Sequence, residues 1–201
     1  MIYDVLIIGG GAAGMSCALV LGSANEKSFA VNKKIGLFTH QKTSHLQTAL
    51  FNNVLGLVPK TTGKTILEGG LQQLSELYPH VNRIDDEKVL EIRGITEGFL
   101  ILTNKNEYQT KLVVIAIGYT KLLTIKGLEQ YIEPHNKTKP EKERIQLRNN
   151  DHMVTKGMYV AGTLAGWRSQ FSIACGSGAS VATDILTLWN DGKHTKIHDK
   201  I

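Results

Sequence analysis

The sequence predicts an α/β fold in three layers: a central parallel sheet, helices packed against it and a small antiparallel β-meander. Three observations predict this fold. An apolar strand at 3–8 runs through a glycine-rich turn into an apolar helical stretch at 12–23, as in the start of a βαβ unit. A second apolar run at 112–117 ends at a glycine and is typical of a buried parallel strand. Short segments between 88 and 111, separated by turn residues, indicate the meander.

The other elements follow in chain order from their periodicity. A strand is expected at 35–39, and the helix expected at 64–78 carries four leucines on one face, which predicts a stripe that faces the core. The segments 40–58 and 121–150 have weak or polar patterns and predict no regular element. The remaining expected strands are 81–84, 88–93, 99–104, 108–111 and 158–161, followed by a last helix at 172–191.

The composition is that of an ordinary globular chain, with 201 residues of which 42% are hydrophobic and 20% charged. We therefore expect one domain at 1–192 and a flexible tail at 193–201. The apolar stretch 5–21 follows Asp4 and is interrupted by glycines, so it predicts core rather than a membrane span or a signal peptide. The protein is accordingly expected to be cytoplasmic, with no membrane contact.

Charge and cysteine content exclude further classes. The formal net charge is +5, but the basic residues gather in 137–148 and 193–200 without interleaved aromatic residues, so no nucleic-acid partner is expected. The two cysteines, Cys17 and Cys175, are far apart in the chain and form no Cys-x-x-Cys pair. They predict neither a redox dithiol nor a metal site, and each is interpreted as a packing residue.

The strongest functional signal is the Gly-x-Gly-x-x-Gly turn between the first strand and the first helix. Gly9 permits the tight turn, Gly11 lets the backbone approach a pyrophosphate, and Gly14 lets the helix pack on the strand. Ala12 and Ala13 begin the helix, whose free N-terminal amides favour an anion. The alternative, a turn that binds nothing, would leave three glycines weakening the junction without purpose. The turn therefore predicts a dinucleotide site.

Three motifs together resemble the FAD-binding half of the thioredoxin reductase-like flavoproteins, within the FAD-dependent pyridine nucleotide-disulfide oxidoreductase family. The first is the turn at 9–14. The second is Val-Val-Ile-Ala-Ile-Gly at 113–118, which is similar to a family motif that normally reads Ala-Thr-Gly. The third is 155–163, similar to a motif that normally closes in Gly-Asp. The resemblance spans nearly the whole chain and implies a Rossmann-like FAD-binding fold.

The resemblance also implies where FAD would lie. Gly118 and Gly162 end two strands, and Gly162 would allow close approach of the ribityl chain while Thr163 bonds one of its hydroxyls. The backbone of Val89 would meet the adenine. Asn53 would lie near the flavin ring, with an ordinary turn asparagine as the equal alternative. The helix start at Gln170, Phe171 and Ser172 would face the pyrimidine edge of the flavin.

Two departures from the family pattern concern acidic residues. Thr39 and His40 occupy the end of the second strand, where the family places a carboxylate on the adenosine ribose, and His40 is interpreted as a solvated loop residue. Thr163 stands where the third motif normally has Asp. A neutral hydroxyl still bonds a ribose, at a cost of about 1 kcal/mol relative to a charged acceptor. FAD is therefore expected to bind, but less tightly.

The largest departure is a missing domain. In the family, a nicotinamide-binding unit lies between the second and third motifs, whereas 36 residues separate Gly118 from Thr155 here. That is fewer than the roughly 50 residues a domain needs for its own core. In family terms the expected FAD domain is 1–118 joined to 151–192, with 119–150 in place of the nicotinamide unit.

These observations leave three hypotheses. The first is an FAD-dependent oxidoreductase without a dithiol relay, whose flavin is reduced by a small-molecule or protein electron donor or by its substrate. The second is a non-catalytic flavin-binding or nucleotide-binding sensor or complex subunit. The third is an NAD(P)-binding reductase, with a basic ribose environment from Lys33, Lys34, His40 and Lys42.

The sequence identifies no catalytic residue. Trp167 and Arg168 precede the last helix and are candidates for lining a substrate pocket, with helix packing as the alternative for the tryptophan. A homodimer is expected, because a flavoprotein without its second domain would otherwise expose apolar surface.

Overall fold

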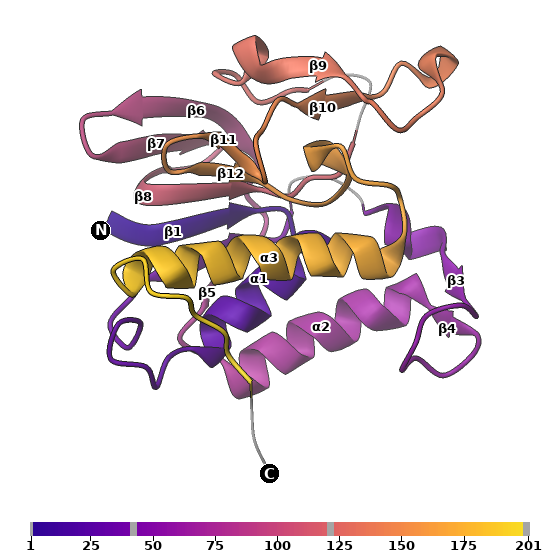
Figure 1. The fold of residues 1–201 in the computed structure, drawn as a ribbon, viewed down its shortest axis with the longest axis horizontal. Helices are drawn as coiled ribbons and strands as arrows, with labels where there is room; N and C mark the ends of the chain where they lie inside the picture. Colours follow the sequence, from indigo (N-terminus) through magenta and orange to yellow (C-terminus); the bar gives the residue numbers. More distant parts are fainter. Residues whose placement is uncertain (1, 41–43, 120–122, 199–201) are drawn as a thin grey trace.

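The computed structural model describes residues 2–40, 44–119 and 123–198. Its helices and strands alternate along the chain, as the α/β prediction requires (Figure 1). The strands are β1 (Ile2–Ile8), β2 (Ile35–Phe38), β3 (Leu50–Phe51), β4 (Thr61–Thr62), β5 (Asn82–Ile84), β6 (Val89–Ile95), β7 (Gly98–Thr103), β8 (Glu107–Ile115), β9 (Ile132–Pro134), β10 (Ile145–Leu147), β11 (Met153–Thr155) and β12 (Met158–Val160). The helices are α1 (Ala12–Ser23), α2 (Gly63–Leu77) and α3 (Phe171–Trp189), with short 3-10 turns η1 (His45–Thr48), η2 (Glu129–Tyr131), η3 (Pro140–Lys142) and η4 (Gly162–Ala165).

An eight-stranded sheet forms the middle of the molecule, and its central strands run parallel. The main path is β11-β12-β8-β1-β2-β5, and β7 and β6 extend from β8 as an antiparallel ribbon. The pairs β12 with β8, β8 with β1, β1 with β2 and β2 with β5 are all parallel. Their carboxyl ends therefore meet at one edge, where ligands bind in sheets of this kind.

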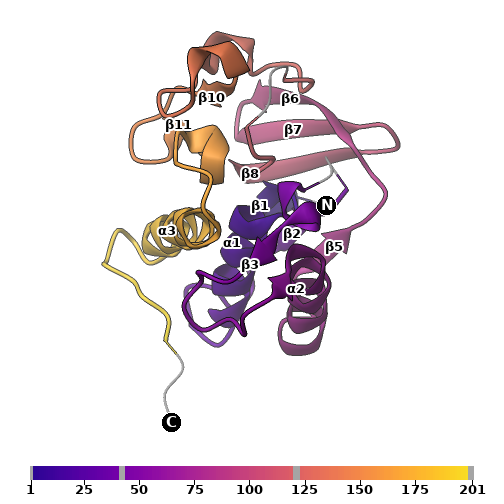
Figure 2. The same cartoon turned by 90° about the vertical axis from the view of Figure 1, so that its right-hand side faces the viewer.

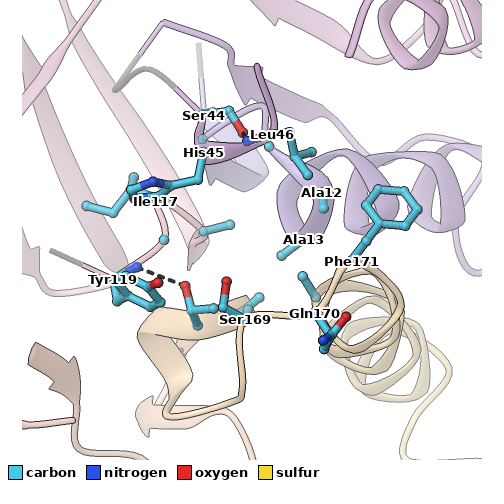
Figure 3. A pocket seen from close by; sticks show the side chains of 18 of the residues that line it. Ala12, Ala13, Ser44, His45, Leu46, Ile117, Tyr119, Ser169, Gln170 and Phe171 are labelled. Carbon is cyan, nitrogen blue, oxygen red and sulfur yellow. Dashed lines mark hydrogen bonds between the residues drawn. The ribbon is translucent and has the colours of Figure 1, made fainter. Parts of the chain in front are cut away.

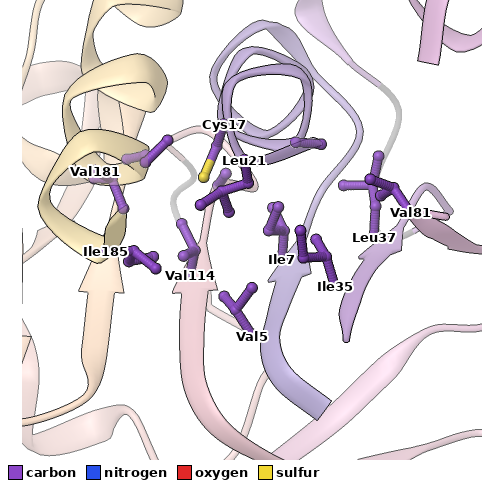
Figure 4. Packing of buried hydrophobic residues seen from close by; sticks show 14 of the residues in the cluster. Val5, Ile7, Cys17, Leu21, Ile35, Leu37, Val81, Val114, Val181 and Ile185 are labelled. Carbon is purple, nitrogen blue, oxygen red and sulfur yellow. The ribbon is translucent and has the colours of Figure 1, made fainter. Parts of the chain in front are cut away.

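The three helices cover one face of the parallel strands, and the β6–β7 ribbon and the β9–β10 hairpin lie over the other face (Figures 1 and 2). Side chains of β1 alternate between the two layers: Val5 and Ile7 face the helices, whereas Leu6 and Ile8 face the opposite side. Figure 4 shows the helix-side core, where Leu21 of α1 and neighbouring apolar side chains meet the sheet. The expected three-layer α/β fold is confirmed.

Helix α3 is 19 residues long and largely apolar. Among helices in the described residues, it is the one long and apolar enough to cross a membrane by length and hydropathy. Buried core helices of globular proteins pass the same test. Val181, Ala182, Ile185 and Leu186 of α3 are fully buried in the helix-side core, so in this fold one face of α3 packs against the sheet.

Several elements differ from the sequence prediction. The expected strands 108–111 and 112–117 are one strand, β8, because no turn residue separates them and both parts pair with β1. The short strands β3, β4, β9, β10 and β11 were not predicted, since two or three residues carry no period. The expected leucine stripe of α2 is wrong at one end: Leu74 is fully buried, but Leu77 is 58% exposed.

Part of the segment expected as a flexible tail contacts the body of the molecule within the described residues. Thr195 is buried and accepts a hydrogen bond from the Nδ2 of Asn190 (3.1 Å). Ile197 packs against the helix-side core. The chain after Gly192 therefore returns to the body of the molecule as far as these residues, and the expectation for 199–201 lies outside the described residues.

Backbone packing between α1 and α3 generates the first prediction. A Cβ on Gly178 would lie 1.9 Å from the carbonyl oxygen of Ala13, whereas a Cβ on exposed Gly176, in the same helix, would meet nothing within 4 Å. We expect Gly178→Ala to lower the free energy of unfolding by on the order of 2 kcal/mol or more, through overpacking. Gly176→Ala should instead raise it by up to about 1 kcal/mol, through helix propensity.

Urea denaturation followed by circular dichroism measures both changes. Equal stability of the two variants would contradict the close helix contact.

Candidate functional site

A cavity of about 220 Å³ opens at the edge where the carboxyl ends of β1, β8 and β12 meet (Figure 3). Segments far apart in the sequence converge there: the glycine turn, the loop after β8, the loop after β12 and the start of α3. The lining residues are Gly9, Gly10, Gly11, Ala12, Ala13, Ser44, His45, Leu46, Ala49, Phe51, Ala116, Ile117, Gly118, Tyr119, Ala161, Gly162, Thr163, Ser169, Gln170, Phe171 and Ala174.

The three fingerprint glycines have the geometry that their roles require. Gly9 has φ +115°, a conformation that favours glycine, and a Cβ there would lie 2.6 Å from the carbonyl oxygen of Ala116. A Cβ on Gly14 would lie 1.8 Å from the carbonyl oxygen of Gly9, so the helix meets the turn directly. At Gly11 a Cβ would find only Ser44 Oγ, at 3.5 Å, and would project into the cavity. The backbone at Gly11 is therefore open to the cavity, and we call this open backbone the glycine cradle.

Two helices begin at this cavity. Helix α1 has Gly11 as its N-cap and α3 has Gln170, and neither residue makes a side-chain capping hydrogen bond. Neither first turn contains an acidic residue. The backbone N–H groups of both first turns therefore remain available to a ligand, and both helix dipoles favour negative charge there.

The second and third motifs meet at the opposite wall. Ala161 donates its N–H to the carbonyl of Ile115 (2.9 Å), which holds the ends of β12 and β8 together. Thr163 Oγ1 accepts the N–H of Tyr119 (2.9 Å, dashed in Figure 3), so its own hydroxyl proton is free to turn towards a ligand. Gly162, between Ala161 and Thr163 in the chain, has φ +74° and no side chain.

Buried polar groups support the third motif from behind. The N–H of Gly162 donates to Ser177 Oγ (2.8 Å), which lies 2.9 Å from Nε2 of His152. The carbonyl of Thr163 lies 2.9 Å from Nε2 of His135, whose Nδ1 accepts the N–H of Lys137 (3.1 Å). Because Nδ1 accepts, neutral His135 carries its proton on Nε2 and donates it to Thr163.

His152 is held as a neutral acceptor. Trp167 donates its indole N–H to Nε2 of His152 (3.1 Å), and the two rings stack with centroids 5.9 Å apart. Burial lowers the pKa of His152, partly offset by the carboxylates of Asp151 and Asp184. Trp167 lines a separate polar cavity with His152 and does not line the main one, so its expected substrate-pocket role is not supported. Arg168 is exposed and likewise absent from the lining of the main cavity.

Most of the expected cofactor residues line the main cavity: Gly9, Gly11, Ala12, Ala13, Gly118, Gly162, Thr163, Gln170 and Phe171. Gly14 lies in the first turn of α1 and contacts the Gly9 backbone instead.

Five other expected residues lie outside the cavity lining. Thr39 is adjacent to Gly10, since a Cβ on Gly10 would lie 3.2 Å from the Cα of Thr39, and His40 is exposed beside it. Val89 has its side chain in the opposite core. Asn53 and Ser172 are exposed, each next to a segment whose phenylalanine lines the cavity.

Sequence reasoning missed the wall formed by η1 and β3. Ser44, His45, Leu46, Ala49 and Phe51 all line the cavity but lie in the segment that gave weak periodicity. Ser44 Oγ accepts the N–H of Leu46 (3.2 Å) and caps η1. That serine cap is the one local signal for a short helical turn here.

Aromatic contacts join this wall to the rest of the site. The rings of Phe51 and Phe171 lie 5.2 Å apart, and those of His45 and Tyr119 lie 5.6 Å apart. The cavity therefore has apolar aromatic surface beside its open amides, which is the combination small-molecule sites use.

Among the described residues, the basic ribose environment suggested for NAD(P) is not assembled. Lys33 and Lys34 precede β2 at its amino end, away from the glycine turn: the Lys33 ammonium lies over the ring of Trp189 (5.4 Å), and the Lys34 N–H donates to Asp4 (2.9 Å). His40 is exposed, and Lys42 lies outside the described residues. Lys33 and Lys34 thus lie at the end of β2 that is opposite to the glycine turn, which contradicts the expectation for these two residues.

Cys17 is fully buried and Cys175 is partly buried. Burial raises the pKa of the fully buried Cys17, and burial also raises the pKa of Cys175, slightly offset by hydrogen bonding to Ser16. A protonated thiol is a poor nucleophile.

The cavity fits a phosphate-bearing dinucleotide. A bare glycine cradle at Gly11 and two uncapped helix starts provide donors for a pyrophosphate. Thr163 and Gly162 provide a polar edge without bulk for a ribityl-like chain. These are features of the chain's own residues, and they do not depend on the identity of the base or ring.

Known proteins with related sequences are reductases. A ferredoxin–NADP reductase of Streptococcus pyogenes serotype M3 is 28% identical over 116 residues, which cover 58% of this chain and 34% of that protein. The corresponding protein of Levilactobacillus brevis is 28% identical over 131 residues, covering 63% of this chain and 38% of that one. The chain thus spans about a third of the length of these curated relatives.

Solved structures with the same fold include thioredoxin reductases. One from Gloeobacter violaceus superposes with a TM-score of 0.74 at 14% identity, covering 100% of this chain and 99% of that one. A ferredoxin-flavin thioredoxin reductase from Clostridium acetobutylicum gives 0.70 at 17% identity, covering 95% and 98%. These similarities establish the fold.

One family model matches residues 3–173, from the first strand to the start of α3. The chain belongs to the pyridine nucleotide-disulphide oxidoreductase family.

Proposed function

We propose that this chain binds FAD and works as a flavin-dependent oxidoreductase of the thioredoxin reductase type, without a dithiol relay. The observation that carries the proposal is the convergence of three motif ends and two uncapped helix starts on one cavity. FAD bound there would supply the electron-transfer chemistry through its ring.

The residues of the chain have separate tasks in this proposal. The amides at Gly11 and the first turn of α1 hold the pyrophosphate, and Gly162 and Thr163 bind the ribityl hydroxyls. The amides at the start of α3 stabilise negative charge on the reduced ring. Phe51 and Phe171 exclude water from one side of the cavity.

In this proposal, the electrons that reduce the flavin come from a donor outside the described fold. The segment between the second and third motifs forms the β9–β10 hairpin. Leu128 before this hairpin and Leu147 in it are fully buried in the same core as Ile115. This supports one FAD-binding domain at 1–192, in which 119–150 stands in place of a nicotinamide unit. The flavin would then be reduced by a protein carrier, a small molecule or the substrate.

A non-catalytic flavin sensor or complex subunit is the second candidate. It is favoured by the absence of a carboxylate at Thr39 and Thr163, the two positions where the family pattern has one. We place the protein in the cytoplasm, without a nucleic-acid or membrane partner. We also propose a homodimer, since Leu55 and Val58 in the loop between β3 and β4 are 102% and 76% exposed.

Cofactor content and reduction test the main proposal. We expect the purified protein to be yellow or to turn yellow with FAD, and mass spectrometry of the released cofactor to give FAD. Under anaerobic conditions NADPH alone should leave the flavin oxidised, because the described fold offers no nicotinamide unit, whereas dithionite should bleach it.

Each other outcome has a distinct meaning. A protein that stays colourless with excess FAD would refute flavin binding. Rapid bleaching by NADPH would show that nicotinamide reaches the flavin directly. If dithionite reduces the flavin, but no protein carrier, substrate or oxidant supports its turnover, the result would favour the sensor.

The pyrophosphate cradle gives a second prediction. Gly11 has φ −81°, which alanine tolerates, and its Cβ would project into the cavity. We expect Gly11→Ala to weaken FAD binding on the order of tenfold or more, equivalent to about 1.4 kcal/mol. The apo protein should lose at most about 1 kcal/mol of stability, as alanine is a poorer N-cap than glycine.

Fluorescence titration with FAD measures the affinity, and urea denaturation measures the stability. Gly69→Ala is the matched control, because a Cβ on Gly69 of α2 meets nothing within 4 Å. Unchanged FAD affinity in Gly11→Ala would place the pyrophosphate elsewhere.

A further inference from the structure

The end of β2 lacks the carboxylate that dinucleotide sites use to bind the adenosine ribose, but the neighbouring strand brings one to the same place. β5 lies beside β2 in parallel register, with Phe38 opposite Ile84. Thr39 donates its N–H to the carbonyl of Ile84 (3.2 Å), so the two strands stay paired through their ends. Asp85 is the residue that follows, and its carboxylate therefore leaves the sheet beside Thr39.

A short hydrogen bond links the two side chains. Thr39 Oγ1 lies 2.5 Å from Oδ1 of Asp85. An ionised carboxylate only accepts, so the threonine hydroxyl must donate its proton to Asp85. Thr39 Oγ1 then keeps its lone pairs as an acceptor. Hydrogen bonding in series strengthens an acceptor of this kind, since each bond polarises the next.

The carboxylate is oriented and still accessible. Its other oxygen, Oδ2, accepts from Nη2 of Arg83 (2.9 Å), which fixes the plane of the group. The side chain of Asp85 is 48% exposed, so the carboxylate is accessible from solvent. Next to this pair is the glycine turn, because a Cβ on Gly10 would lie 3.4 Å from the Cβ of Thr39.

We propose that Asp85, directly and through Thr39, is the acceptor for the adenosine ribose hydroxyls of the bound dinucleotide. The carboxylate that such sites place at the end of the second strand is here supplied by the end of β5. This inference rests on the proposed FAD binding. It replaces the expectation that a neutral Thr39 acts alone, since the described geometry gives that threonine a charged partner.

The chain offers a matched control for the carboxylate. Asp86 is adjacent and exposed, and its φ of +58° is one that asparagine also adopts readily. Asp85→Asn and Asp86→Asn remove the same charge one residue apart. Only the first replaces the charged acceptor of the Thr39 hydroxyl by a neutral one.

Titration of the apo proteins with FAD and with FMN, which has no adenosine, tests the inference. We expect Asp85→Asn and Thr39→Val each to weaken FAD binding roughly fivefold to tenfold. The first variant replaces a charged acceptor by a neutral one, and the second removes the threonine hydroxyl. Thr39→Ser, which keeps the hydroxyl, and Asp86→Asn should stay within about twofold of the natural chain. FMN binding should be unchanged in all four variants.

A competition experiment addresses the ribose itself. ADP should displace FAD from the natural chain better than 2′,3′-dideoxy-ADP, which lacks both hydroxyls. This preference should shrink in Asp85→Asn. Because Thr39 and Asp85 act as a pair, the double variant Thr39→Val with Asp85→Asn should lose less affinity than the product of the two single losses.

The outcomes separate this inference from the proposed function. If the natural chain binds FAD but Asp85→Asn behaves as Asp86→Asn does, with no change in the ADP preference, the role of Asp85 is refuted while FAD binding stands. If the natural chain binds no FAD, both fail. Urea denaturation of each apo variant identifies a change in folding, and in that case the Thr39→Ser and Thr39→Val comparison decides the inference.

Discussion

The close approach of backbone to backbone around the first turn is the constraint on which the site depends. Gly14 brings α1 against the Gly9 carbonyl, and Gly178 brings α3 against the Ala13 carbonyl. Neither approach leaves room for a Cβ, so the two helices are fixed with respect to β1 and to each other. Their first turns consequently open on the same cavity. A site with two helix dipoles directed at one ligand follows from where glycine stands in the chain.

Strand β8 connects this site to the rest of the sheet. Its first residues pair with β7 and form the antiparallel ribbon, and its last residues pair with β12 and carry the second motif to the cavity edge. Because the same strand also pairs with β1 along most of its length, the first and second motifs keep a fixed separation. The order of strands therefore assembles three motifs that extend from Gly9 to Thr163 in the chain.

The sequence predicted the features that short-range chemistry determines. The turn at Gly9, the cradle at Gly11 and the close packing at Gly14 follow from one six-residue pattern, and the structure places each as expected. It could not predict contacts made by strand register. Asp85 meets Thr39 only because β5 pairs with β2, and residues at 82–85 have no pattern that announces this. The cavity wall at 44–51 was missed for the same reason, since η1 and β3 are positioned by tertiary packing.

The segment between the second and third motifs has a structural role of its own. His135, which follows β9, donates to the Thr163 carbonyl, and the guanidinium of Arg144 lies 4.9 Å from the ring of Tyr119. Tyr119 in turn donates its N–H to Thr163. The hairpin is thus attached at both motifs that flank it, through residues at the cavity wall. A spacer that merely joined two halves of a domain would need none of these contacts. Their arrangement instead supports a fold in which the hairpin holds Tyr119 and Thr163, two residues of the cavity wall, in place from outside the cavity.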